Sequence, residues 1–177
     1  MRAELALLRH LAARGLSVAA PLTDEPLVSP DGMWVVVVTA WAPGAMLLKR
    51  AEPWGWMHEA DVVRAQGAWL AQLHQLSADW ARAHPALAVE LPLWSDVHDG
   101  ILAPVPLPDE LQAADPVVLH GDFNVSNFHW HADTTDNASP LVVFDWDQAQ
   151  RGPPAYDPAQ VFFFFFFFWE GGGAWLN

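Results

Sequence analysis

The sequence lacks cysteine and is poor in basic residues. Without cysteine there can be no disulfide and no thiolate metal site, which is compatible with a reducing cytoplasm, the compartment we expect. Only 8 Lys and Arg stand against 21 Asp and Glu, so the formal net charge is −13. A chain this acidic repels a phosphate backbone, so we expect no nucleic-acid partner; a cationic or metal-bridged ligand fits better.

Long apolar stretches and a targeting signal are also missing. The longest apolar run, residues 161–169, has about half of the roughly 20 residues that a membrane-spanning helix needs. Charged residues, among them Glu4 and Arg9, interrupt the first 20 positions and exclude the apolar core of a signal peptide. The run holds seven consecutive phenylalanines, Phe162 to Phe168. The sequence leaves open whether they are buried against another element or are a reading-frame artefact.

The chain is long enough for one domain with a core, since it has 177 residues of which 53% are hydrophobic. Apolar residues at helical spacing predict two amphipathic helices, at residues 3–14 and 59–76, and Gly15 is a natural stop for the first. The apolar positions are Leu5, Leu8, Leu11 and Ala12 in the first helix and Val62, Trp69, Leu73 and Leu76 in the second.

The strand signals are short. The turn Pro30-Asp31-Gly32 between Leu27-Val28 and the β-branched run 34–39 predicts a hairpin whose second strand is buried. Residues 84–116 hold many prolines, among them Pro104, Pro106 and Pro108, and are expected to form an irregular connection with one short helix. The apolar runs 117–119, 128–130 and 141–144 predict three further strands, each of which ends at polar residues.

Two of these strand ends carry a pattern typical of phosphoryl transfer. The segment from His120 to Asn127 opens at the first, and Asn127 lies five residues after Asp122. Kinase catalytic loops place at this interval a carboxylate that takes the proton of the acceptor hydroxyl and an amide that helps to hold magnesium. We therefore predict Asp122 as the catalytic base and Asn127 as a metal ligand.

The second strand end supplies further carboxylates. Asp145 and Asp147 follow the run 141–144 directly. Magnesium is a hard cation that prefers oxygen ligands, and it is completed in kinases by the phosphates of the nucleotide. This pattern predicts Asp145 as the principal magnesium ligand, and it leaves open whether Asp147 adds a contact or faces solvent.

Three motifs in this order resemble the signature of the aminoglycoside phosphotransferase and choline kinase-like families. They are His120-Gly121-Asp122 with Asn127, then Phe144-Asp145-Trp146-Asp147, then Gly152-Pro153-Pro154-Ala155-Tyr156-Asp157-Pro158-Ala159. Upstream, residues 66–74 resemble the family's helix before the catalytic loop, and residues 39–44 resemble its interlobe hinge. The resemblance implies an α+β, protein-kinase-like fold with a partial N-terminal sheet lobe and a mainly helical C-terminal lobe that carries the catalytic hairpins.

The resemblance also implies an activity and further site residues. The activity is ATP- and magnesium-dependent transfer of a phosphoryl group to a hydroxyl of a small-molecule acceptor, which the acidic charge suggests to be cationic. The implied site residues are Thr39, Ala40 and Trp41 as hinge backbone that binds adenine, His120 as the residue that orients the catalytic loop, Asp157 as its brace, and Glu4 as the candidate partner of a nucleotide-binding lysine.

The chain also departs from the family pattern. Nothing before residue 3 supplies a glycine-rich loop or a strand bearing the phosphate-binding lysine, and Lys49, the only lysine, lies beyond the hinge and is expected to be a surface charge. We therefore expect a single partial phosphotransferase domain over residues 1–177, inactive as it stands. Its parts would be an N-lobe remnant at 1–40, a hinge at 41–44 and a truncated C-lobe at 45–177.

Two alternatives belong to other functional classes. One is a non-catalytic, kinase-like binding remnant. The other is a metal-dependent hydrolase, in which His129 and His131 share a strand face and join His120 and Asp145 around zinc. The hydrolase leaves the spacing of Asn127 unexplained, and neither the sequence nor the resemblance identifies the acceptor.

Overall fold

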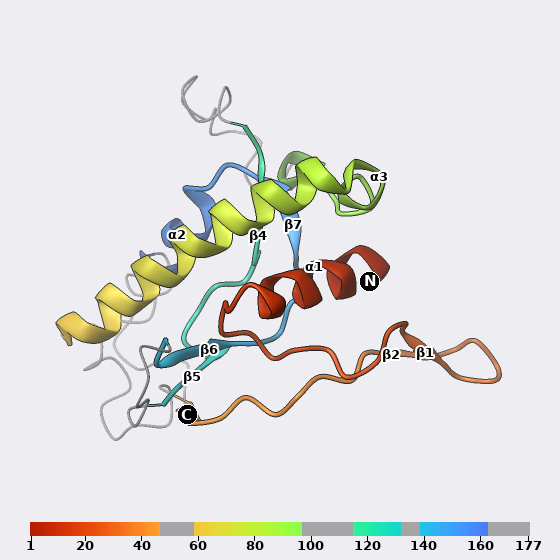
Figure 1. Cartoon of the computed structure of the whole chain (residues 1–177), viewed down its shortest axis with the longest axis horizontal. Helices are drawn as coiled ribbons and strands as arrows, with labels where there is room; N and C mark the ends of the chain where they lie inside the picture. Colours follow the sequence, from red (N-terminus) through yellow and green to blue (C-terminus); the bar gives the residue numbers. More distant parts are fainter. Residues whose placement is uncertain (47–58, 97–114, 132–138, 163–177) are drawn as a thin grey trace, which may run out of the picture.

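The computed structural model describes residues 1–46, 59–96, 115–131 and 139–162 (Figure 1). The expectations for Lys49, the prolines 104, 106 and 108 and phenylalanines 163–168 lie outside these residues. The elements are α1 (Arg2–Ala13), β1 (Leu27–Val28), β2 (Val35–Val36), β3 (Ala45–Met46), α2 (Ala60–Ala83), α3 (Pro85–Ala88), β4 (Val117–Leu119), β5 (Phe128–Trp130), β6 (Leu141–Val143) and β7 (Gln150–Gly152), and residues 156–162 are also helical.

The strands form three small antiparallel sheets, β1–β2, β3–β5–β6 and β4–β7. In Figure 1, α2 runs across β4 and β7, and α1 lies beside them. Helices packed on small antiparallel sheets are an α+β arrangement, so the expected fold class is confirmed. In the described part of the chain, no helix is both long enough and apolar enough to span a membrane.

One hydrophobic cluster joins α1 to the rest of the molecule. Leu7, Leu8 and Leu11 of α1 are buried together with Trp69 and Leu73 of α2 and with residues of β4, β5 and β6. The predicted apolar faces of both helices are therefore the faces that pack. Gly15 ends α1 in the left-handed region at φ 81°, as its position predicted.

Helix α2 extends beyond its predicted end at Leu76, because the residues that follow have partners inside the fold. Trp80 is buried in the core, and the helix stops at Ala83, just before Pro85. Ser77 is also buried, and its Oγ donates to the Val118 carbonyl and accepts the Val118 N–H, both at 3.2 Å. The Val118 backbone groups, on the side of β4 away from β7, are thus satisfied by a helix side chain.

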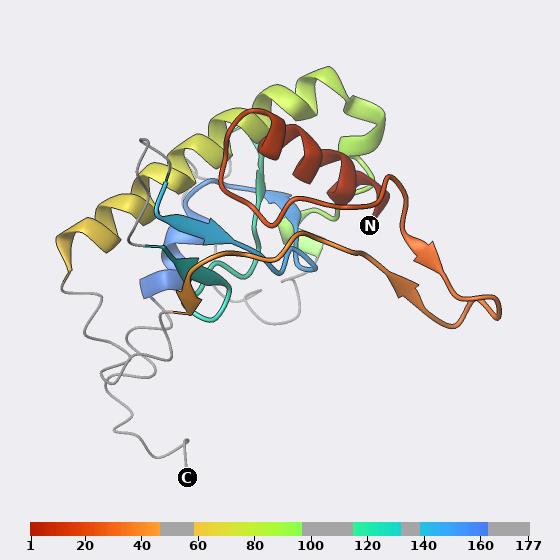
Figure 2. The ribbon, with the colours of Figure 1, turned by 60° about the horizontal axis from the view of Figure 1, so that its bottom comes forward.

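The predicted hairpin forms, but the prediction that its second strand is buried was wrong. β1 and β2 pair Leu27 with Val36 and Val28 with Val35. All four side chains are between 47% and 62% exposed. Figures 1 and 2 show the reason, which is that the hairpin extends away from the helices and the other sheets, so no described element covers it.

Candidate active site

The loop between β4 and β5 holds the carboxylate of Asp122 from two sides. The Asn127 Nδ2 donates to Oδ2 at 2.7 Å, and the Asn124 Nδ2 donates to Oδ1 at 2.8 Å. Asn127 also donates to the Asp122 carbonyl at 2.8 Å. The predicted pair of Asp122 and Asn127 is therefore in direct contact, and Asn124, which the sequence reasoning did not single out, completes the arrangement.

The amide of Asn127 has a defined orientation. Its nitrogen must face the Asp122 carboxylate, because a carboxylate only accepts hydrogen bonds. Its Oδ1 then lies on the opposite side, where it accepts the Ser126 hydroxyl at 3.2 Å. An amide oxygen has two lone pairs, so this atom can accept the hydroxyl and contact a cation.

Gly121 brings this loop against the loop that follows β6. It adopts φ 85°, and a Cβ at this position would lie 1.9 Å from the Gln148 carbonyl oxygen. Both the left-handed conformation and the close approach require glycine. The motif glycine therefore has a steric role, in that it lets the backbones of the two site loops touch.

His120 links the same two loops through its ring. Its Nδ1 accepts the Asp122 N–H at 3.3 Å and its Nε2 donates to the Phe144 carbonyl at 3.0 Å, which is the neutral tautomer. Complete burial lowers the pKa of His120, in agreement with a neutral ring. The Phe144 N–H also donates to the Asn127 carbonyl at 3.0 Å. Asp145, the next residue, is thus tied to the catalytic loop through its neighbour.

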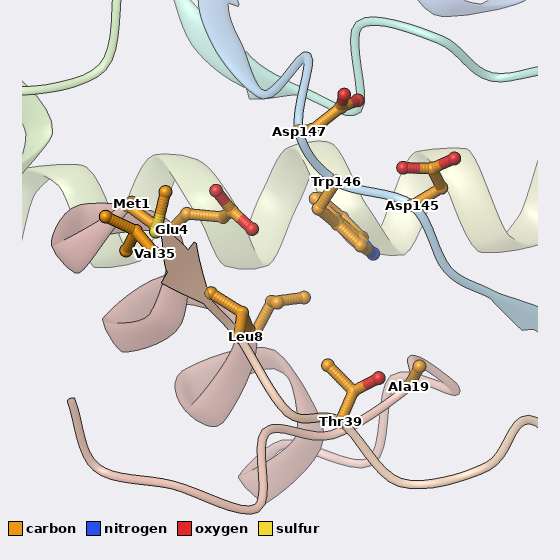
Figure 3. A pocket seen from close by; sticks show the side chains of 10 residues that line it. Met1, Glu4, Leu8, Ala19, Val35, Thr39, Asp145, Trp146 and Asp147 are labelled. Atoms are coloured by element: carbon orange, nitrogen blue, oxygen red, sulfur yellow. The ribbon is translucent and has the colours of Figure 1, made fainter. Parts of the chain in front are cut away.

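Asp145 and Asp147 line a cavity of about 290 Å³ together with Glu4 and Thr39. Figure 3 shows Glu4 extending from α1 toward the loop that carries the two aspartates. Partial burial raises the pKa of Asp145, and the Asp147 carboxylate raises it further. Burial also raises the pKa of Glu4, and both aspartates add to this shift. The acidic side chains thus repel one another across the cavity, where a cation would be stabilised.

The Asp145 backbone explains how both aspartates reach this cavity. Asp145 has φ 64°, a left-handed conformation that is uncommon outside glycine and that ends the extended path of β6. The chain therefore turns directly after Phe144, and Asp147 lines the same cavity because of this turn. The alternation of side chains along β6 therefore does not continue to Asp147.

Asp157 lies beneath the catalytic loop. It is fully buried, and its carboxylate accepts the backbone N–H groups of His120 and Gly121, both at 3.1 Å. The His74 Nε2 lies 3.3 Å from the same carboxylate. These contacts are those of a residue that holds the loop backbone.

The predicted hinge residues contribute differently to the cavity. Thr39 lines it, whereas the Ala40 N–H donates to the Ala20 carbonyl at 2.7 Å. Thr39 pairs with Pro21 in an antiparallel β-bridge. This pair lies between two hydrogen bonds, the one from Ala40 and one from the Leu22 N–H to the Val38 carbonyl, so it is a non-hydrogen-bonded pair. The N–H and C=O of Thr39 therefore point away from residues 20–22. These two backbone groups of Thr39 form an outer edge that offers one hydrogen-bond donor and one acceptor.

Two of the three histidines proposed as zinc ligands have other partners for their side chains. His120 uses both ring nitrogens within the fold, and the His129 Nδ1 donates to the Ala42 carbonyl at 2.8 Å. Among the described residues, no group of three or more His, Asp or Glu side chains is arranged to hold a metal ion. The geometry therefore does not support the zinc hydrolase. A magnesium site in a kinase needs fewer protein ligands, because the nucleotide phosphates and water complete it.

The fold matches that of solved phosphotransferase structures. Residues 1–175 match the model of the phosphotransferase enzyme family, and the chain belongs to that family. No curated protein matches the chain.

Three solved structures with the same fold can be compared with the chain. An amicoumacin kinase in complex with AMP-PNP, Ca²⁺ and Ami has a TM-score of 0.69 at 19% identity, over 94% of this chain and 53% of its own. Aminoglycoside phosphotransferase APH(3'')-Id from Streptomyces rimosus has a TM-score of 0.56 at 18% identity, and the match covers 90% of this chain and 64% of that protein. A GDP complex of aminoglycoside 2'-phosphotransferase-IIIa has a TM-score of 0.52 at 16% identity, and the match covers 88% of this chain and 60% of that protein. The chain thus spans between 53% and 64% of the length of these proteins.

Proposed function

We propose that the chain carries the catalytic loop and the metal ligands of an ATP-dependent kinase that phosphorylates a hydroxyl of a small molecule. The observation that carries this proposal is the connection between the two strand ends. His120 joins the loop of Asp122 to Phe144, the residue before Asp145. Phosphoryl transfer depends mainly on positioning and charge stabilisation, so a base and a metal ligand held in fixed relation are the parts it requires.

Asp122 is the proposed proton acceptor. Asn124 and Asn127 hold its carboxylate in one orientation, and the side chain is only half-buried, so a substrate hydroxyl can approach it. A carboxylate held in this way can take the hydroxyl proton as the bond to phosphorus forms.

The residues present fit magnesium. All the proposed ligands are oxygen donors, namely the Asp145 carboxylate and the Asn127 amide oxygen, with Asp147 beside them. The repulsion that raises the pKa of Asp145 would be relieved by a divalent cation. When bound, the metal would neutralise charge on the transferred phosphoryl group, while the protein residues fix where it lies.

The outer edge at Thr39 is the proposed adenine contact. Its backbone N–H and C=O point away from residues 20–22, and Thr39 lines the cavity that also contains Asp145. Trp41 would extend this edge, whereas the Ala40 N–H is already bonded to Ala20. Structures with this fold that contain AMP-PNP and ADP support the use of a nucleotide.

The acceptor that we propose is a small molecule bearing an amine, because a net charge of −13 attracts cations. The same charge disfavours nucleic acid, and a cytoplasmic location, where ATP is available, is part of the proposal. Related folds contain streptomycin and kanamycin in their complexes, which supports this class of acceptor.

The base assignment is tested with Asp122→Asn, which keeps the shape of the side chain and removes its ability to take a proton. In protein that carries a glycine-rich loop and a lysine strand ahead of this chain, we expect acceptor-dependent ADP release to fall by about 100- to 10,000-fold with an unchanged circular dichroism spectrum. Asp115→Asn, at an exposed aspartate away from the site, is the matched control. Turnover close to wild type in Asp122→Asn contradicts the assignment. Nucleotide binding without turnover in the wild type favours the binding remnant.

The metal assignment is tested with Asp145→Ala. Loss of the principal anionic ligand should weaken binding of magnesium–ATP by about tenfold or more, which corresponds to about 1.4 kcal/mol. Titration calorimetry at fixed magnesium measures this, with Asp115→Ala as the control for a lost negative charge. An affinity equal to that of the wild type would show that Asp145 does not hold the metal.

A further inference from the structure

The backbone around Asp122 is held by a second side chain that the motifs do not include. Gln160 lies three residues after Asp157 on the helical segment 156–162, so both side chains reach the same loop. The Gln160 Nε2 donates to the Gly121 carbonyl at 2.6 Å, and its Oε1 accepts the Phe123 N–H at 2.9 Å. These two bonds fix the backbone immediately before and immediately after Asp122.

Together, Asp157 and Gln160 leave the loop little freedom. Asp157 accepts the N–H groups of His120 and Gly121, and Gln160 binds the Gly121 carbonyl and the Phe123 N–H. Four backbone groups between His120 and Phe123 are thus bonded to one turn of helix, while the Asp122 carbonyl accepts Asn127. We define this set of bonds from Asp157 and Gln160 as the loop clamp.

Only a neutral amide can make both bonds of Gln160. The Phe123 N–H needs an acceptor and the Gly121 carbonyl needs a donor, so the two partners determine which amide atom is oxygen and which is nitrogen. A glutamate would place a second oxygen against the Gly121 carbonyl, close to the buried carboxylate of Asp157. Because glutamine and glutamate have the same shape, the effect of this change reports on hydrogen bonding rather than on packing.

We propose that Gln160 is a positioning residue for Asp122. It touches the backbone that carries the base rather than the carboxylate or the cavity of Asp145, so it sets where the base lies and not how the nucleotide binds. The catalytic part of this inference rests on the proposed function. The structural part, the protection of the Phe123 N–H, does not.

The test compares Gln160→Glu and Gln160→Met with Gln75→Glu, in which an exposed glutamine of α2 receives the same charge. The readout that needs no activity is hydrogen exchange of the Phe123 amide. We expect faster exchange in Gln160→Met, which has no acceptor, and unchanged exchange in Gln75→Glu. Exchange at the wild-type rate in Gln160→Met overturns the clamp.

The second readout is how the kinetic effect of the substitution divides between kcat and KM. In Gln160→Glu we expect kcat to fall by about 10- to 100-fold, as a displaced catalytic group would cause, with KM for ATP within about twofold of wild type. An unchanged kcat, or a loss confined to KM, overturns the positioning role. Absence of phosphoryl transfer in wild-type protein that carries a glycine-rich loop and a lysine strand ahead of this chain contradicts the proposed function instead, and the exchange measurement then decides the clamp alone.

Discussion

At the scale of single residues, two glycines show that a left-handed backbone and a close steric contact are separate reasons for a position to require glycine. Gly15 and Gly121 have nearly the same φ, 81° and 85°, but a Cβ at Gly15 meets no atom within 4 Å, whereas at Gly121 it meets the Gln148 carbonyl at 1.9 Å. The tight turn at Gly121 therefore has two independent requirements for glycine, and the helix end at Gly15 has one.

This difference gives a quantitative prediction. Gly15→Ala should lower the free energy of unfolding by about 1–2 kcal/mol, which is the cost of the left-handed conformation. Gly121→Ala should cost at least about 3 kcal/mol, because the backbone contact must also break. Urea denaturation of both variants measures the two values. Equal losses would show that the two loops can separate at little cost.

The site residues differ in how far the sequence reveals them. Asp122, Asn127 and Asp145 were predicted because their spacing and strand-end positions are local patterns. Gln160 was missed because its partners lie 37 and 39 residues earlier in the chain, and no local pattern relates a glutamine to a backbone so distant. The raised pKa of Glu4 likewise arises from burial, and also from aspartates that only the fold brings near.

At the scale of elements, the sequence predicts a strand where apolar residues recur. It does not predict a strand that is extended only because it pairs with another strand. The apolar runs of β4, β5 and β6 were correctly predicted. β7 was missed because Gln150-Arg151-Gly152 has no strand pattern, and it is extended because it pairs with β4. The exposure of the hairpin was missed for a different reason, which is that burial depends on neighbouring elements. A β-branched run predicts a strand but does not show whether anything covers it.

Ser77 provides an element-scale prediction, because its hydroxyl satisfies both backbone groups of Val118 on the side of β4 away from β7. Ser77→Ala leaves a buried N–H and C=O without this partner and should lower the free energy of unfolding by about 1–3 kcal/mol. Ser95→Ala, at an exposed serine, should change it by less than about 0.5 kcal/mol. Thermal or urea unfolding measures both. Equal small effects would show that α2 and β4 do not depend on this contact.

At the scale of the whole molecule, His120 makes stability depend on pH. Burial lowers the pKa of His120 in the folded state, whereas in the unfolded chain it is about 6.5. Below about pH 6.5 the unfolded state therefore binds more protons than the folded state. Stability is fully present above this pH and decreases as the pH falls, by up to about 1.4 kcal/mol per unit for this group.

The measurement is urea denaturation between pH 7.5 and pH 5.0, values that bracket the ordinary histidine range. His120→Gln removes the titrating ring but keeps one donor and one acceptor, so its stability should fall less steeply with acid. The other histidines are the same in both proteins and act as the internal control. Parallel slopes would indicate that the ring of His120 does become protonated in the folded state.

The single core described above determines which part of the molecule can move. Because Leu7, Leu8 and Leu11 of α1 are buried with α2, rotation of α1 away from the cavity would expose the core. The hairpin buries little, yet Val35 of its second strand lines the same cavity. If a nucleotide binds as we propose, movement over it would therefore fall to the hairpin, while Glu4 and Asp145 stay in place.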